Sequence, residues 1–330
     1  GFQNVRVEEF DMPVWVRGEE RAEIVAPFPQ PLVLAALGRS GATPAAGITA
    51  EIIAFDSVAA LRDAPDAAVR GKIVYITHRM TRTQDGSGYG QFGAPRFQGP
   101  GLASRKGAAA IVVRSIGTDS HRNPHTGTTS WPEGVRPIPA AALSNPDADQ
   151  LERILSRGQP VRMRLVLTPR MVGTRRSGNV VAEVPGTDPA AGAILIGGHL
   201  DSWDNAPGAF DNAAGVATTT AAAKRIMDAG RPRRTIRVVA FGAEEVGVFG
   251  GAAYFQRNHP GDAVLVAESD FGADRVWRLR TRLAPANQAL GDRLAALLAP
   301  LGIVRGRDPA GAGADLGPWA RAGVAAIDLN

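Results

Sequence analysis

Three short apolar runs, each of the length of a buried strand, punctuate the second half of the chain: residues 194–196, 234–241 and 263–268. An Ala-rich stretch over 211–229, closed by Gly230, follows the first run and predicts a helix. A second, amphipathic helix is expected over 286–299. Strands and helices in this order predict an α/β fold, with a largely parallel sheet flanked by helices.

Before residue 170 the predicted elements are mostly short strands. Alternating positions over 1–22 predict strands, and the Pro-rich stretch 27–31 marks a boundary. Further short strands are expected at 48–55, 72–77, 109–114, 140–143 and 161–167, interrupted by two short helices, one of them over 146–156 and opened by Asn145. The chain therefore divides into N-terminal strands (1–22), an inserted β-rich domain (23–170) and an α/β domain (171–330).

Acidic residues and one histidine stand where the predicted strands end. They are His199 and Asp201, the pair Glu244 and Glu245, and Asp270, while Asp211 comes ten residues after Asp201, where the Ala-rich helix begins. Because the carboxyl ends of parallel strands meet at one edge of a sheet, these side chains are expected to converge there. A buried histidine among carboxylates needs a compensating cation, and a metal ion is the simplest one.

Nitrogen and oxygen ligands without a thiolate suit zinc, and equally cobalt or manganese. One bridging carboxylate can hold two such ions a few Å apart. Of the adjacent Glu244 and Glu245, one can bind a metal while the other acts as general base. Asp201, which shares one face of an extended chain with His199, can accept the second ring N–H of that histidine.

Each of these residues also has an ordinary structural explanation. His199 follows two glycines, as turn and capping residues do. Asp211 alone is most simply a helix N-cap. The pair Glu244 and Glu245 can form a solvated turn, and Asp270 can be a surface acid. Four such coincidences at the ends of consecutive strands are less economical than one shared site.

Several segments resemble the di-zinc exopeptidases of the aminopeptidase and glutamate carboxypeptidase clan: HLDSWD (199–204), GAFDNAAGV (208–216), VVAFGAEEVGVFGG (238–251) and ESDF (268–271). The resemblance extends over nearly the whole chain, including PVWVRGEE (13–20) and RNPHTG (122–127). HLDSWD together with RNPHTG narrows it to the carboxypeptidase Q-like subgroup.

The resemblance implies the zinc exopeptidase fold with an inserted protease-associated domain, and two zinc ions. It implies His199 and Asp270 on one zinc, Asp211 bridging, Glu245 on the other zinc, Glu244 as general base, Asp201 as the acid that orients the histidine, and a cis peptide between Asp211 and Asn212. Members of the clan supply one more histidine from a segment beyond residue 330 of this sequence, and have helices before its first residue. We therefore expect a piece of a longer protein, with a second zinc site short of one ligand. A secreted or periplasmic location is likewise implied by the resemblance.

Composition adds mainly exclusions. The formal net charge is +5 on 330 residues, and the basic side chains are scattered and almost all arginine, so a nucleic-acid partner is not expected. The absence of cysteine excludes disulfides and thiolate metal sites. No apolar run is long enough to span a bilayer, so no membrane partner is expected.

The sequence thus predicts a co-catalytic zinc exopeptidase that hydrolyses short peptides, either dipeptides or N-terminal residues. Two other interpretations stay open: an inactive peptidase-like binding protein with an incomplete metal site, and a single-zinc acyltransferase of the glutaminyl cyclase type. The bridging position of Asp211 and the inserted domain argue against the second. The loops 86–101 and 121–127 either shape substrate access or form simple turns. Side-chain preference and the presence of a homodimer are not decided by the sequence.

Overall fold

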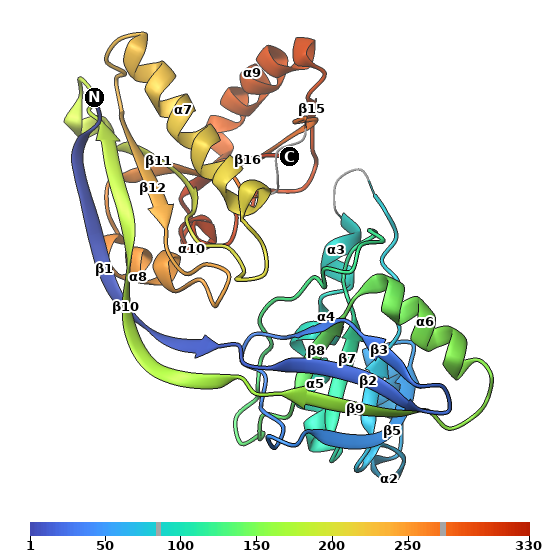
Figure 1. Ribbon diagram of the computed structural model, residues 1–330. Helices are drawn as coiled ribbons and strands as arrows, with labels where there is room; N and C mark the ends of the chain where they lie inside the picture. The colour runs from blue at the N-terminus through green and yellow to red at the C-terminus, as the bar shows by residue number, and fades with distance from the viewer. Residues whose placement is uncertain (84–86, 271–274) are drawn as a thin grey trace. The chain divides into compact units, whose positions relative to one another are not determined.

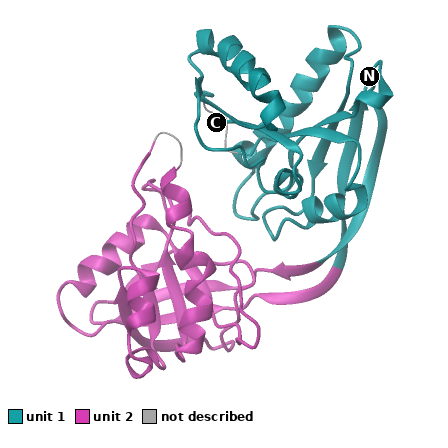
Figure 2. Cartoon of the chain, turned by 180° about the vertical axis from the view of Figure 1, so that it is seen from behind, with its two compact units in different colours: residues 1–12, 175–330 teal, residues 13–174 magenta. Residues whose placement is uncertain are grey.

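A computed structural model describes residues 1–83, 87–270 and 275–330. Two compact units make up the chain: residues 1–12 with 175–330 form unit 1, and residues 13–174 form unit 2 (Figures 1 and 2). The long strands β1 (Gln3–Val16) and β10 (Arg170–Val184) each contribute to both units. The unit limits lie some residues from the predicted domain limits, because β2 (Glu20–Ala26) pairs with β9 (Arg162–Leu167) inside unit 2. A protease-associated domain stays a prediction for unit 2.

Unit 1 is built on an eight-stranded sheet of order β1-β10-β12-β11-β13-β16-β14-β15. Its remaining strands are β11 (Ala193–His199), β12 (Thr235–Phe241), β13 (Ala263–Glu268), β14 (Arg278–Arg282), β15 (Val304–Arg305) and β16 (Ala325–Leu329). The four central strands are parallel, whereas β10 runs antiparallel to β12 and β14 antiparallel to β16. The expected largely parallel sheet is therefore wrong, because the sheet is mixed.

The reversal of β14 follows from the length of its connection. Only residues 269–277 separate β13 from β14. A parallel crossover needs about a dozen residues or more, usually with a helix. A connection of this length therefore favours a strand that runs back in the opposite direction, and β14 does so beside β16.

Helices cover both faces of this sheet (Figure 1). They are α7 (Gly215–Asp228), α8 (Phe249–Asn258), α9 (Gln288–Leu298) and α10 (Gly317–Arg321), with single 3-10 turns at Pro189–Ala191, Pro285–Asn287 and Ala299–Leu301. Successive side chains of β11 point to opposite faces of the sheet. Leu195 belongs to one apolar cluster with Tyr254 of α8 and Trp319 of α10, whereas Ile194 packs against a second cluster that contains Ala223 of α7.

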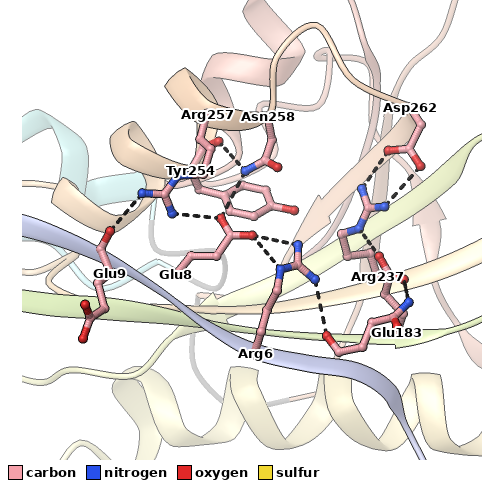
Figure 3. A network of polar contacts seen from close by, with 10 residues as sticks. Arg6, Glu8, Glu9, Glu183, Arg237, Tyr254, Arg257, Asn258 and Asp262 are labelled. Carbon is pink, nitrogen blue, oxygen red and sulfur yellow. Dashed lines mark hydrogen bonds and ion pairs between the residues drawn. The ribbon is translucent and has the colours of Figure 1, made fainter.

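A polar network fastens β1 to the rest of unit 1 (Figure 3). The Glu8 side chain, which is buried, accepts hydrogen bonds from Arg6 at 2.7 Å, and from Arg257 and Asn258 of α8 at 3.3 Å each. Arg257 also donates to the backbone carbonyl of Glu9 at 2.9 Å. These contacts hold an edge strand whose outward face is exposed at Val5 and Val7.

Unit 2 has its own eight-stranded sheet, of order β3-β2-β9-β5-β6-β7-β8-β4. Its other strands are β3 (Gln30–Leu32), β4 (Leu34–Ala36), β5 (Ile48–Phe55), β6 (Ile73–Ile76), β7 (Ala110–Arg114) and β8 (Ala140–Leu143). Strands β5 to β8 are parallel to one another and the remaining pairs are antiparallel. This second sheet is mixed as well.

The described part of unit 2 contains six helices where two were expected. They are α1 (Val58–Asp63), α2 (Asp66–Val69), α3 (Ser87–Gln91), α4 (Ala94–Phe97), α5 (Gly99–Arg105) and α6 (Asn145–Leu155). The N-cap of α6 is Ser144, whose hydroxyl accepts the amide hydrogen of Asp147, and not Asn145. Helices of one or two turns are too short to show a helical period in the sequence.

Helices α3 to α5 also replace most of the glycine-rich loop expected over 86–101, of which residue 86 lies outside the described residues. Proline in the first turn of α4 and α5 is compatible with a helix, since the amide it removes has no helical partner there. Across the whole described chain, none of the helices combines the length and the apolar character needed to cross a membrane.

Candidate metal centre

The carboxyl end of β11 places His199 at the centre of a cluster of acids. The histidine is 1% exposed, and its Nε2 lies 2.9 Å from Oδ1 of Asp270 and 3.0 Å from Oδ1 of Asp211. One ligand atom from each of the three residues lies within 4.8 Å of the others. Among the residues that the structure describes, this is the one group of His, Cys, Asp and Glu with metal-binding spacing.

Asp211 reaches this cluster from a distorted helical entry. The turn Ala209–Ala214 is π-helical, but Asp211 and Asn212 within it have non-helical dihedral angles, and the regular helix begins at Gly215. The peptide bond between Asp211 and Asn212 is cis, as the resemblance implied. The carboxylate of Asp211 turns to His199, and the N-cap of α7 is Ala214, so the N-cap explanation of Asp211 is wrong.

The residue after Asp211 ties this entry to the exit of β13. Asn212 is 1% exposed and donates from Nδ2 to the carbonyl of Ser269 at 2.8 Å. Its Oδ1 accepts the amide hydrogen of Gly215 at 3.1 Å. Asp270 directly follows Ser269, so Asn212 holds the segments of both acids in place.

Asp201 contacts two parts of the site with different atoms. Its backbone carbonyl accepts from Nδ1 of His199 at 2.8 Å, while its carboxylate oxygen Oδ1 lies 3.7 Å from the same nitrogen. The carboxylate instead accepts the backbone amide hydrogens of Glu244, at 2.9 Å, and of Glu245, at 3.1 Å. The expected bond between the Asp201 carboxylate and the histidine ring is thus replaced by one from its backbone.

Glu244 and Glu245 lie close to the cluster in a shielded environment. Burial raises the pKa of Glu244 to about 7, with a further contribution from the negative charge of Asp270. Burial and then the charge of Asp211 raise the pKa of Glu245 to about 8. Glu245 is not part of the three-residue cluster, so its expected place on a second ion stays a prediction.

The electrostatics of His199 indicate that the cluster requires a positive charge. Burial by itself lowers the pKa of this histidine, but hydrogen bonds to Asp211 and Asp270 outweigh it and raise the pKa to about 12. A proton on Nε2 therefore stands between the two carboxylates. Since Nδ1 faces a carbonyl, which can only accept, Nε2 is the ring nitrogen free to bind a metal. One imidazole nitrogen and two carboxylates are a donor set that fits zinc.

Two further buried acids interact electrostatically with the cluster, and their positions in the sequence predicted no role for them. Glu268 accepts the amide hydrogen of Leu316 at 2.9 Å, and Asp315 accepts that of Gly251 at 3.0 Å. Burial raises the pKa of both carboxyl groups above their ordinary values, and the negative charge of Glu268 raises the pKa of Asp315 further. Glu268 precedes the predicted ligand Asp270 by two positions, and this spacing could have predicted that it lies near the site. Asp315 lies in an irregular segment, where no pattern in the sequence predicts its position.

Comparison with known proteins shows the family. The profile of Peptidase family M28 matches residues 179–330. Carboxypeptidase Q of Bos taurus is 34% identical over 333 residues, which cover 100% of this chain and 69% of that protein. Carboxypeptidase Q of Homo sapiens is 34% identical over 332 residues, with the same coverage of 100% and 69%. The chain belongs to peptidase family M28.

Solved structures agree with this membership. The crystal structure of a Peptidase M28 precursor from Shewanella amazonensis SB2B matches this M28 chain with a TM-score of 0.96 and 43% identity, over 100% of this chain and 75% of that one. BSAP, a zinc aminopeptidase from Bacillus subtilis, shares the fold with a TM-score of 0.67 at 18% identity, over 99% of this chain and 74% of that one. Membership of this family and similarity to the carboxypeptidase relatives together show that this M28 chain is a metallo-exopeptidase.

Proposed function

We propose that this M28 peptidase is a co-catalytic zinc exopeptidase that hydrolyses short peptides, either dipeptides or N-terminal residues of longer ones. The observation that carries the proposal is the convergence of His199, Asp211 and Asp270 at one sheet edge, with Glu244 and Glu245 beside them. The name of the two carboxypeptidase Q relatives supports peptide substrates. A secreted or periplasmic location is proposed from the resemblance.

In this proposal His199 and Asp270 would hold one zinc ion, Glu245 would hold the second, and Asp211 would be shared between them. When bound, zinc supplies Lewis-acid chemistry that polarises a scissile carbonyl and makes water acidic. The charges of Asp270 and His199 act on the carboxyl group of Glu244. It takes a proton from the attacking water and delivers it to the nitrogen of the leaving amine, so that the peptide C–N bond breaks without a charged amide leaving group.

A single-ion enzyme is the second candidate, because the described residues form one three-residue cluster. A cyclase-type acyltransferase would need one zinc, whereas the co-catalytic mechanism needs two. An inactive binding protein would bind peptide without cleaving it. Metal stoichiometry and product analysis on the full-length protein distinguish the three.

Replacing each glutamate in turn tests the assignment of roles. Glu244→Gln is expected to keep both zinc ions and to lower kcat by about 10²–10⁴-fold, because it removes the general base. Glu245→Gln is expected to lower bound zinc from two ions to one. Zinc is measured by elemental analysis after dialysis, and kcat by release of amino acid from dipeptides. Comparable zinc loss in both variants, or full activity of Glu244→Gln, would contradict the roles proposed here.

A further inference from the structure

The backbone and the side chain of Asp201 contact different parts of the site. We propose that the Asp201 carboxylate is a positioning residue for the Glu244–Glu245 turn, while the orientation of His199 depends on the backbone of Asp201 alone. The inference rests on the proposed role of Glu244 as general base. It concerns which atoms of Asp201 act on which part of the site.

The carboxylate is matched to two successive amides. Oδ1 accepts from the amide of Glu244 at 2.9 Å and Oδ2 accepts from the amide of Glu245 at 3.1 Å. Hydrogen bonds to an ionised acceptor are among the stronger ones in proteins, and two parallel bonds also restrict direction. The side chain is 26% exposed, so these bonds are partly shielded from water. The pair of bonds therefore places the backbone of both glutamates.

The histidine does not need this carboxylate. Nδ1 of His199 lies 2.8 Å from the carbonyl oxygen of Asp201 and 3.7 Å from its carboxylate. The carbonyl is present whatever side chain stands at position 201. The tautomer and ring orientation of His199 can therefore survive a substitution of Asp201.

The glutamate turn has a reason to need an external support. The parallel ladder between β11 and β12 ends at the pair His199 and Phe241, before the turn begins. Ala243, the residue before Glu244, has φ of +60°, a conformation that a residue with a Cβ adopts only where its surroundings hold it. Within the turn the amide of Val248 donates back to the carbonyl of Glu244 at 2.7 Å. The bonds from Asp201 connect this locally closed turn to the exit of β11.

Asp201 thus connects the segment of the proposed base to the histidine at the candidate metal centre. Its carbonyl holds His199 and its carboxylate holds the amides of Glu244 and Glu245. Removing the carboxylate is expected to displace the base while leaving His199 in place. A displacement on the order of 1 Å can lower a reaction rate about 100-fold.

The test compares Asp201→Asn and Asp201→Ala with Asp228→Asn, which changes an exposed carboxylate on α7. Asn keeps the size of the side chain and one acceptor oxygen, whereas Ala keeps neither oxygen. In the full-length zinc-loaded protein we expect the zinc ion assigned to His199 to be retained and the ion assigned to Glu245 to bind more weakly. KM should stay within about threefold, with kcat about 10–100-fold lower for Asn and lower still for Ala. Asp228→Asn is expected to match the unmodified protein.

Amide hydrogen exchange supplies a second readout that does not depend on turnover. Peptides covering 242–248 should exchange faster in Asp201→Asn, and faster again in Asp201→Ala, both with and without zinc. Loss of both zinc ions from Asp201→Asn, including the one assigned to His199, would show that the carboxylate orients the histidine, and would overturn the inference. Unchanged exchange over 242–248 would overturn it as well. Full activity of Glu244→Gln would instead refute the proposed base, while the exchange result would still test the support of the turn.

Discussion

His78 illustrates how a single buried residue can control stability. It follows β6 in unit 2, is 9% exposed, and packs edge-on against the ring of Phe92 at 5.0 Å between centroids. Its Nε2 has no hydrogen-bond partner among the described residues. Burial, and then the charge of Arg114, lower its pKa from 6.5 to about 4. The folded protein therefore holds this histidine neutral.

This shift predicts acid sensitivity. Because the folded pKa lies below the unfolded one, the unfolded chain binds the proton more tightly. The associated stability is present above pH 6.5 and is lost as the pH falls towards 4, by about 3 kcal/mol in total. Urea unfolding of His78→Leu at pH 4.5 and 7.5 should show a smaller pH dependence than the unmodified protein, and His121→Gln, at an exposed histidine, an unchanged one. An unchanged dependence in His78→Leu would place the acid sensitivity elsewhere.

At the scale of elements, the site depends on how closely α7 approaches the exit of β13. A Cβ added at Gly215, the first residue of α7, would lie 2.0 Å from the carbonyl oxygen of Ser269 and 2.2 Å from Oδ1 of Asn212. Gly215 has ordinary helical dihedral angles, so the requirement is for space and not for conformation. The two acids Asp211 and Asp270 stand next to these contacts.

Replacing Gly215 is therefore expected to act against the usual helix preference. Ala in place of Gly inside a helix usually stabilises by up to about 1 kcal/mol. Gly215→Ala should instead destabilise by about 1–3 kcal/mol, through overpacking, and should weaken zinc binding. Gly90→Ala in α3 has nothing within 4 Å of the new Cβ and serves as the control. Thermal unfolding and zinc titration measure both effects, and a stabilised Gly215→Ala would show that the close approach is not rigid.

At the scale of the whole molecule, each unit carries its own core. Among the described residues, the buried apolar side chains form four clusters, two in unit 1 and two in unit 2. The proposed metal ligands all belong to unit 1. Binding energy at the metal centre should therefore stabilise one unit more than the other.

Zinc at about 100 times its dissociation constant should raise the stability of unit 1 by about 2.7 kcal/mol. Hydrogen exchange at increasing urea, with zinc and with a chelator, should show this gain in peptides from β11, β12 and β13. Peptides from β6 and β7 of unit 2 are the internal control and should change little. Equal gains in both units would mean that they unfold as one cooperative body.

Several features followed from the pattern of the chain alone. The apolar run 263–268 coincides with β13, and runs ending near His199 and Phe241 became the neighbouring parallel strands β11 and β12. The spacing of the apolar residues and the length of each run are enough to predict such strands, because a buried central strand is apolar throughout. The chemical types of His199 and Asp270 at the strand exits, and of Asp211 at the helix entry, were enough to predict that they meet, since parallel strands bring their carboxyl ends to one edge.

Other features depended on contacts between segments distant in the sequence. The pairing of β14 with β16 joins segments distant in the sequence, and the short helices of unit 2 show too few turns to reveal a period. The carboxylate of Asp201 bonds to amides more than forty residues away, where a local interpretation assigned it to the nearest histidine. Asp315 became a buried acid only because its irregular segment packs against α8. The sequence by itself determined which residue types stand at the strand ends, whereas the tertiary structure decided which backbone and side-chain groups satisfy one another, because hydrogen-bond partners are chosen by distance in space and not along the chain.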